Sequence, residues 1–177
     1  MAIVLLLGGA RSGKSAMAMR LASDSGAPVT FIATAQPGDD EMAERIERHR
    51  VDRPASWKTV EAPVDLIGAV RTSDADDYLV LDCLTLWVSN LVGSGSSPDE
   101  TEAAACEVIA ALQGRSGVVV TNEVGLGIVP ANELARSFRD VLGAVNSLFA
   151  AAADRSVLMV AGRALDLSST EAVLRPL

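Results

Sequence analysis

The chain has 177 residues, of which 49% are hydrophobic and 3% aromatic, and its formal net charge is −8. This composition predicts a domain with an aliphatic core and excludes a disordered chain. It also argues against a nucleic-acid-binding protein, which needs a basic surface. Phosphate binding must therefore be local, through a few side chains and backbone amides.

The cysteines and the apolar segments limit where the protein works. Two cysteines, Cys83 and Cys106, exclude a disulfide framework. The apolar runs are too short to span a membrane. The opening apolar run, Met1 to Leu7, lacks the basic residues of a signal peptide and stops at Gly8. We therefore expect a cytoplasmic protein.

Five short aliphatic runs predict β-strands. Each is continuously apolar, which is typical of strands buried on both faces of a parallel sheet. In chain order they are Ile3 to Leu7, Val29 to Ala33, Tyr78 to Leu81, Gly117 to Thr121 and Ser156 to Val160.

Helical patterns fall between these runs, and Pro98 and Pro130 precede the last two, as at helix starts. The alternation predicts an α/β fold with parallel strands, in a single domain over residues 1–177. We expect an irregular tail after Ala161. The predicted helices are Ser15 to Ala22, Asp40 to Val51, Val64 to Arg71, Leu84 to Leu91, Asp99 to Leu112 and Asn132 to Ala153.

The segment from Gly8 to Ser15 fits the phosphate-binding pattern G-x-x-x-x-G-K-[ST] without a mismatch. It follows an apolar strand and precedes a helix, as this motif requires. The glycines let successive N–H groups face a phosphate, and the helix N-terminus adds partial positive charge. Lys14 would reach the β- and γ-phosphates, and Ser15 would bind Mg²⁺. The sequence therefore predicts a P-loop nucleotide-binding protein.

Two acidic residues follow predicted strands. Asp82 closes the run from Tyr78 and is the expected carboxylate near the metal, although a strand-end Asp can instead cap the next helix. Glu123 follows the run from Gly117 and either positions a nucleophile or caps a loop.

The single histidine, His49, lies on a charged helix. Helical spacing places Met42, Ile46 and His49 on one face, so we expect His49 to point toward the body of the protein. It is either a half-buried structural residue or a nucleophile that attacks phosphorus and forms a covalent intermediate.

Four segments of the chain together indicate a family, namely Gly8 to Ser15, Ile32 to Ala35, Asp39 to Trp57 and Thr121 to Pro130. With them the chain resembles the bifunctional adenosylcobinamide kinase / adenosylcobinamide-phosphate guanylyltransferases of cobalamin biosynthesis. The resemblance extends from about Ile3 to Gly162. The last segment is the most specific, because a generic P-loop kinase does not need Asn-Glu-Val-Gly-x-Gly followed by Val-Pro.

The resemblance implies two reactions. ATP or GTP phosphorylates adenosylcobinamide, and GTP then transfers GMP to this phosphate, giving adenosyl-GDP-cobinamide and pyrophosphate. The guanylyl group passes through a covalent His–GMP intermediate, for which the matching residue is His49. The resemblance also implies a RecA-like P-loop fold with a mostly parallel sheet flanked by helices, and a homotrimer with active sites between subunits.

The family's functional residues map onto this chain as follows. Catalytic roles fall on His49 and Lys14, and Mg²⁺ on Ser15 and Asp82, where relatives can carry Glu. Relatives can also have two adjacent histidines, where this chain has Arg48 and His49. We expect Arg48 to neutralise phosphate charge instead. The nucleotide-binding positions are Gly8, Gly9, Ala10, Arg11, Ser12, Gly13, Lys14, Ser15, Ala33, Thr34, Ala35, Arg50, Val51, Asp52, Arg53, Glu61 and Asp82.

Two alternatives remain at this stage. One is a P-loop kinase for another small alcohol, in which His49 is structural. The other is a nucleotide-dependent regulatory switch, which would bind and slowly hydrolyse nucleotide without a small-molecule acceptor.

Overall fold

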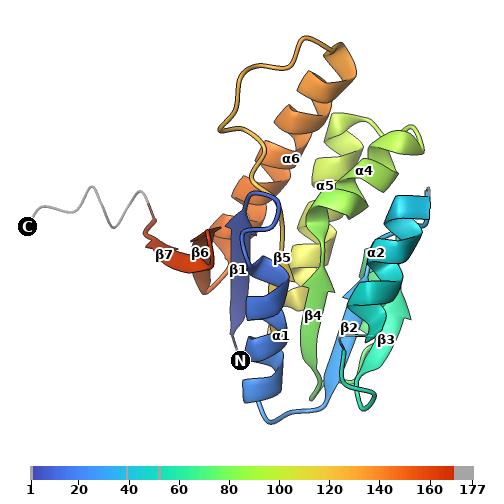
Figure 1. Cartoon of the computed structure of the whole chain (residues 1–177), viewed down its shortest axis with the longest axis vertical. Helices are drawn as coiled ribbons and strands as arrows, with labels where there is room; N and C mark the ends of the chain where they lie inside the picture. Colours follow the sequence, from blue (N-terminus) through green and yellow to red (C-terminus); the bar gives the residue numbers. More distant parts are fainter. Residues whose placement is uncertain (1, 39, 52, 170–177) are drawn as a thin grey trace, which may run out of the picture.

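The computed structural model describes residues 2–38, 40–51 and 53–169, in which strands and helices alternate (Figure 1). In chain order the elements are β1 (Ile3–Gly8), α1 (Lys14–Asp24), β2 (Val29–Ala33), α2 (Asp40–Val51), β3 (Lys58–Glu61), α3 (Leu66–Thr72), β4 (Tyr78–Asp82), α4 (Leu84–Gly93), α5 (Pro98–Leu112), β5 (Ser116–Val120), α6 (Glu133–Ala152), β6 (Arg155–Val160) and β7 (Arg163–Leu167).

The strands form one sheet in the order β3-β2-β4-β5-β1-β6-β7. All neighbouring pairs are parallel except β6 and β7, which are antiparallel. Consequently, the carboxyl ends of β1, β2, β4 and β5 meet at one edge, where open parallel sheets bind their ligands.

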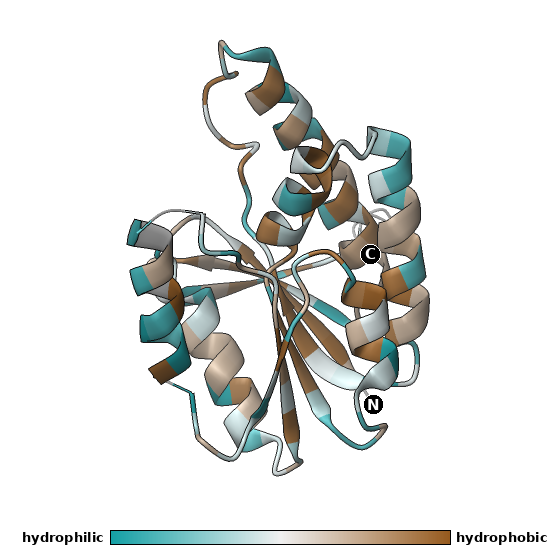
Figure 2. Cartoon of the chain, turned by 90° about the vertical axis from the view of Figure 1, so that its right-hand side faces the viewer, coloured by the Kyte–Doolittle hydropathy of each residue, from teal (hydrophilic) through white to brown (hydrophobic). Residues whose placement is uncertain are grey.

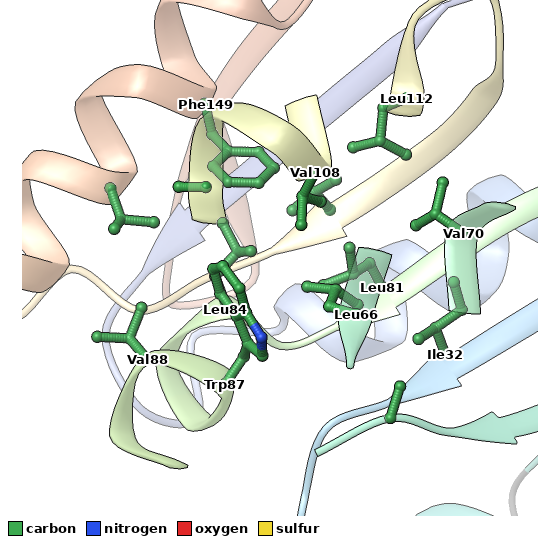
Figure 3. Close-up of a cluster of buried hydrophobic side chains, with 14 of the residues drawn as sticks. Ile32, Leu66, Val70, Leu81, Leu84, Trp87, Val88, Val108, Leu112 and Phe149 are labelled. Atoms are coloured by element: carbon green, nitrogen blue, oxygen red, sulfur yellow. The ribbon is translucent and has the colours of Figure 1, made fainter. Parts of the chain in front are cut away.

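Helices cover both faces of the sheet (Figure 2). Helices α1 and α2 lie on one side, and α3 to α6 lie on the other. On the four-helix side, a large apolar cluster joins these helices to the sheet (Figure 3). At its centre the Trp87 side chain is buried, and its indole N–H donates to the Val64 carbonyl over 2.9 Å. The smaller cluster under α1 includes Ala18, Ala22 and Phe31.

The structure confirms the five predicted strands and six predicted helices, with shifts of a few residues at their ends. It adds β3, whose four residues are too polar and too few to have been recognised as a strand. It also corrects the prediction of an irregular tail after Ala161. Ala161 and Gly162 have φ of 50° and 73°, and this tight turn returns the chain as β7 along β6.

The structure also describes the two cysteines and the lengths of the apolar helices. Cys83 is buried, Cys106 is exposed, and both are free thiols. Within the described ranges, no helix is both long and apolar enough to cross a membrane.

Gly8, the last residue of β1, lies in close contact with β6. Its φ is 152°, and a Cβ atom placed on it would lie 2.3 Å from the Met159 carbonyl oxygen and 2.8 Å from Ser12 Oγ. Any side chain at this position would force the backbone of β6 to move. At Gly9, by contrast, an added Cβ would have no described atom within 4 Å.

We therefore predict that Gly8→Ala lowers the free energy of unfolding by about 2 kcal/mol or more, from the clash and the backbone strain. Gly9→Ala, the matched control, should change it by less than about 0.5 kcal/mol. Urea denaturation of the nucleotide-free protein measures both. Equal effects of the two variants would show that the contact with Met159 does not restrict this position.

Candidate nucleotide site

The loop between β1 and α1 folds around the Lys14 ammonium group. Gly13 precedes the helix with φ of 101°, a left-handed conformation that glycine adopts easily. Lys14 Nζ donates to the carbonyl oxygens of Gly8 and Gly9 over 2.9 and 2.8 Å. Gly162 N donates to the Ser12 carbonyl over 2.9 Å, which ties the loop to the β6–β7 turn. A buried cation thus lies beside a helix N-terminus, an arrangement suited to binding phosphate.

Asp82 ends β4 and faces the same space. Burial raises the pKa of its carboxyl group, while His49, a hydrogen bond from Ser15, Lys14 and Arg53 oppose this shift. The N-cap position of helix α4 is occupied by Cys83, not by Asp82, and no side chain makes a capping hydrogen bond there. The structure therefore favours a role for Asp82 in the site over the alternative of a helix cap.

Two cavities adjoin at Asp82. One, of about 390 Å³, lies between α2 and the ends of β2, β3 and β4; we call it the α2 cavity. The other, of about 630 Å³, lies over the phosphate loop and is called the P-loop cavity. Four residues line both cavities: Ser15, His49, Asp82 and Cys83. A ligand in either cavity therefore contacts the same central group of side chains.

His49 reaches this position from the last turn of α2. It is partly buried, as is Ile46 on the same helix face, in agreement with the predicted orientation. The side chain of Met42, the third residue predicted on that face, lies outside the described part of the structure.

Arg53 fastens the end of α2 to the sheet. Its Nε donates to the His49 carbonyl over 2.9 Å, and Nη1 donates to Thr59 Oγ1 over 3.2 Å. The guanidinium carbon also lies 4.0 Å from the centre of the Phe31 ring, within the range of a cation–π interaction. These contacts restrict the backbone that carries the imidazole.

The structure brings most of the predicted nucleotide residues to the two cavities. The residues from Ala10 to Ser15 line the P-loop cavity, together with Arg48. Gly8 and Gly9 contribute the carbonyl groups that bind Lys14. Five more of the predicted residues line the α2 cavity, namely Ala33, Ala35, Arg50, Arg53 and Glu61.

Three residues predicted to bind nucleotide are not among the described residues that line the two cavities. Thr34 is buried behind the site, where its hydroxyl donates to the Cys83 carbonyl over 2.7 Å and accepts from the Cys83 N–H over 2.8 Å. Val51 is 73% exposed, and Asp52 lies outside the described residues. For Thr34, the hydrogen bonds indicate a structural role in joining β2 to β4.

Glu123 turns away from the cavities toward its own loop. Its Oε1 accepts a hydrogen bond from Gly125 N over 2.5 Å. The geometry favours the loop-capping alternative over the positioning of a nucleophile.

Sequence reasoning did not identify several side chains that line the cavities. Phe31 had the pattern of an ordinary core residue, and Thr59 lies on the strand that was not predicted. Asn122 lines the P-loop cavity, and its place in the motif from Thr121 to Pro130 was the available indication.

Comparison with known proteins identifies the family. Residues 4–167 match the family model described as "Cobinamide kinase / cobinamide phosphate guanyltransferase". The chain belongs to this family. It is 45% identical over 166 residues to the bifunctional adenosylcobalamin biosynthesis protein CobP of Pseudomonas aeruginosa, covering 92% of this chain and 95% of that protein. It is also 45% identical over 175 residues to the CobU protein of Salmonella typhimurium, covering 90% and 96%.

Solved structures support a RecA-like P-loop fold for this family member. The flagellar accessory protein FlaH from Methanocaldococcus jannaschii aligns with a TM-score of 0.51 at 14% identity, covering 97% of this chain and 80% of that chain. The RadB recombinase aligns with a TM-score of 0.52 at 12% identity, covering 89% and 73%. At these identities the likeness concerns the fold alone.

The donors around Asp82 are compatible with a magnesium ion held together with nucleotide phosphates. Among the described residues, no three His, Cys, Asp or Glu side chains form a cluster able to hold a metal without other ligands. Asp82 and Ser15 do supply a carboxylate and a hydroxyl, the hard oxygen donors that Mg²⁺ prefers. Desolvation raises the pKa of the partly buried Asp82 carboxyl group, and a bound cation would stabilise its ionised form.

The raised pKa of Asp82 predicts a pH-dependent stability. A carboxyl group whose pKa is higher in the folded than in the unfolded chain loses stabilising free energy as the pH rises through the folded value. Asp82→Asn removes this titration, so the variant should unfold at higher urea than the wild type at neutral pH. The difference should shrink toward zero below the ordinary pKa range of carboxyl groups.

Urea denaturation in EDTA, from neutral pH to below the ordinary pKa range of carboxyl groups, measures the difference in stability. Asp76→Asn, which removes an exposed carboxyl group, is the control and should leave the pH dependence unchanged. A less stable Asp82→Asn protein at neutral pH would contradict the prediction.

Proposed function

We propose that the protein phosphorylates adenosylcobinamide with ATP or GTP and then transfers GMP from GTP to the cobinamide phosphate. The observation that carries the proposal is the position of His49, which lines both the P-loop cavity and the α2 cavity. A phosphate-binding loop accounts for the first reaction alone. An imidazole beside it provides a nucleophile for the second.

In the kinase reaction, the phosphate loop holds the nucleotide while its terminal phosphorus passes to the acceptor. The bond from this phosphorus to the β-phosphate breaks, a bond to the acceptor hydroxyl oxygen forms, and a nucleoside diphosphate and a proton are released. Lys14 and the N–H groups at the start of α1 stabilise the charge on the phosphate oxygens. Ser15 and Asp82 would hold Mg²⁺, which neutralises phosphate charge when bound.

In the guanylyl transfer, His49 attacks the α-phosphorus of GTP. A nitrogen–phosphorus bond forms, the bond to the β-phosphate breaks, and pyrophosphate leaves. The phosphate of the cobinamide then attacks the same phosphorus, releasing His49 and giving adenosyl-GDP-cobinamide.

The other groups shared by the two cavities are weaker nucleophiles. Burial raises the pKa of the Cys83 thiol to about 11, so this thiol is protonated at neutral pH. The Ser15 hydroxyl group donates a hydrogen bond to the Asp82 carboxyl group. In this position the hydroxyl oxygen is suited to binding Mg²⁺ and not to attacking phosphorus. These properties support His49 as the attacking residue.

We also propose an oligomeric state and a cellular location for the protein. Both reactions take place in a single domain, and the protein forms a homotrimer. It acts in the cytoplasm, where ATP and GTP are available. An interface with other subunits is supported by exposed apolar residues in the loop before α6 and at the start of that helix, which extend beyond the sheet at the top of Figure 1. These residues are Val124, Leu126, Ile128, Val129 and Leu134.

Incubation with GTP labelled at the α-phosphate tests the histidine intermediate. We expect covalent label that is stable in base and lost in acid, as a phosphoramidate should be. His49→Ala should reduce the label by more than about a hundredfold, because the variant lacks the nucleophile. Lysine phosphoramidates share this stability, so peptide mass spectrometry must locate the label.

The composition of the chain makes the control simple. His49 is the single histidine, and Lys14 and Lys58 are the two lysines. Lys58 lies on β3 with its ammonium group against Asp74, so Lys58→Arg should label like the wild type. Label that persists in His49→Ala would exclude His49, whereas tight nucleotide binding without label would favour a simple kinase or a regulatory switch.

A further inference from the structure

Asn122 has a fixed backbone and an uncommitted side chain. It follows β5 and lines the P-loop cavity. Its carboxamide makes no hydrogen bond to the part of the chain that the structure describes, although both of its backbone groups are bonded to buried side chains. The Asn122 carboxamide is therefore held at the P-loop cavity with its hydrogen-bonding groups available to a ligand.

Buried polar residues on the four-helix side of the sheet fix the backbone. Asn122 N donates to Thr85 Oγ1 over 2.7 Å, and Asn146 Nδ2 donates to the Asn122 carbonyl over 3.0 Å. Thr121 Oγ1 completes the network by donating to Asn146 Oδ1 over 2.7 Å. Thr85, Thr121 and Asn146 are all buried, where hydrogen bonds are electrostatically stronger than in water.

Hydrogen bonds to β1 fix the residues on either side. Thr121 N donates to the Leu6 carbonyl over 2.9 Å, and Glu123 N donates to the Gly8 carbonyl over 3.2 Å. The ladder between β5 and β1 therefore continues to the first residue of the phosphate loop. Asn122 is held in register with this loop.

Alternation along the strand explains which way the side chain points. Val118 and Val120 pack in the apolar cluster with α1, whereas Thr121 points to the network on the opposite face. Because side chains alternate between faces, Asn122 lies on the same face as Val120, next to the phosphate loop.

The order of the strands places Asn122 near the terminal phosphate. Strand β5 lies between β1, which leads into the phosphate loop, and β4, which ends at Asp82. In P-loop proteins the loop amides hold the α- and β-phosphates, and the metal bridges the β- and γ-phosphates. The γ-phosphate therefore lies toward the metal-binding side, between Lys14 and Asp82, where β5 ends.

We propose that the Asn122 carboxamide donates a hydrogen bond to the γ-phosphate and so distinguishes nucleoside triphosphates from diphosphates. This inference rests on the proposed binding of the nucleotide in the P-loop cavity. It assigns to Asn122 the recognition of the transferable phosphate, and to Thr85 and Asn146 the positioning of Asn122.

Binding of a matched nucleotide pair tests the proposal. The α,β-methylene analogues of GTP and GDP differ by the γ-phosphate, and neither can guanylylate His49. With Mg²⁺ present, Asn122→Ala should weaken binding of the triphosphate analogue about tenfold, the order expected for a lost hydrogen bond to a charged group. Binding of the diphosphate analogue should change less than about twofold on the same reasoning. Asn122→Asp should weaken the triphosphate further, because a carboxylate repels it.

Asn132→Ala is the matched control. Asn132 caps α6 by accepting from Ala135 N over 3.2 Å, so this variant also loses an asparagine and some stability. It should retain the wild-type preference for the triphosphate. Urea denaturation of each variant confirms that it is folded at the temperature of the binding experiment.

The outcomes separate this inference from the proposed function. A wild-type protein that prefers the triphosphate, together with an Asn122→Ala variant that keeps the whole preference, would overturn the role of Asn122 and leave the kinase proposal intact. Equal weakening of both analogues in Asn122→Ala would also overturn it. A wild-type protein without any preference would contradict both the role of Asn122 and the placement of the triphosphate in the P-loop cavity.

Discussion

The site depends on keeping the buried Lys14 ammonium group near the partly buried Asp82 carboxyl group while leaving room for phosphate between them. Lys14 is buried against the carbonyls of Gly8 and Gly9, and burial raises the pKa of Asp82 even though Lys14 is near enough to oppose the shift. The order of the strands separates these groups, because β5 lies between β1 and β4. Phosphate oxygens and a metal ion would satisfy both charges, which explains why a strongly acidic chain can still bind nucleotides.

One site of this kind serves two reactions if a nucleophile is added beside the phosphate loop. Helix α2 carries His49 to the boundary of the two cavities, and Arg53 ties the end of the helix to Phe31 and Thr59. Phosphoryl transfer uses electrostatic stabilisation, whereas a covalent guanylyl intermediate also needs an attacking atom. The shared residues at the boundary therefore connect the two chemistries within a single fold.

Local patterns in the sequence predicted the parts of the fold and site that depend on neighbouring residues. The phosphate loop, the strand that ends at Asp82 and the inward face of Ile46 and His49 follow from motif and periodicity. Strand β3 was not predicted, because it is a short edge strand with one apolar residue, Val60, and it is held by pairing with β2. The hairpin to β7 likewise depends on a turn at Ala161 and Gly162. The hydrogen bonds of Thr34 and Asn122 could not be predicted without the register between strands, because their partners lie far away in the sequence.

We expect His49 to be required for guanylyl transfer and not for phosphorylation. Mass spectrometry of the corrinoid products, after incubation of the protein with adenosylcobinamide, ATP and GTP, tests it directly. We expect the wild type to form adenosyl-GDP-cobinamide and His49→Ala to accumulate the cobinamide phosphate. Formation of adenosyl-GDP-cobinamide by His49→Ala at the wild-type rate would contradict the account.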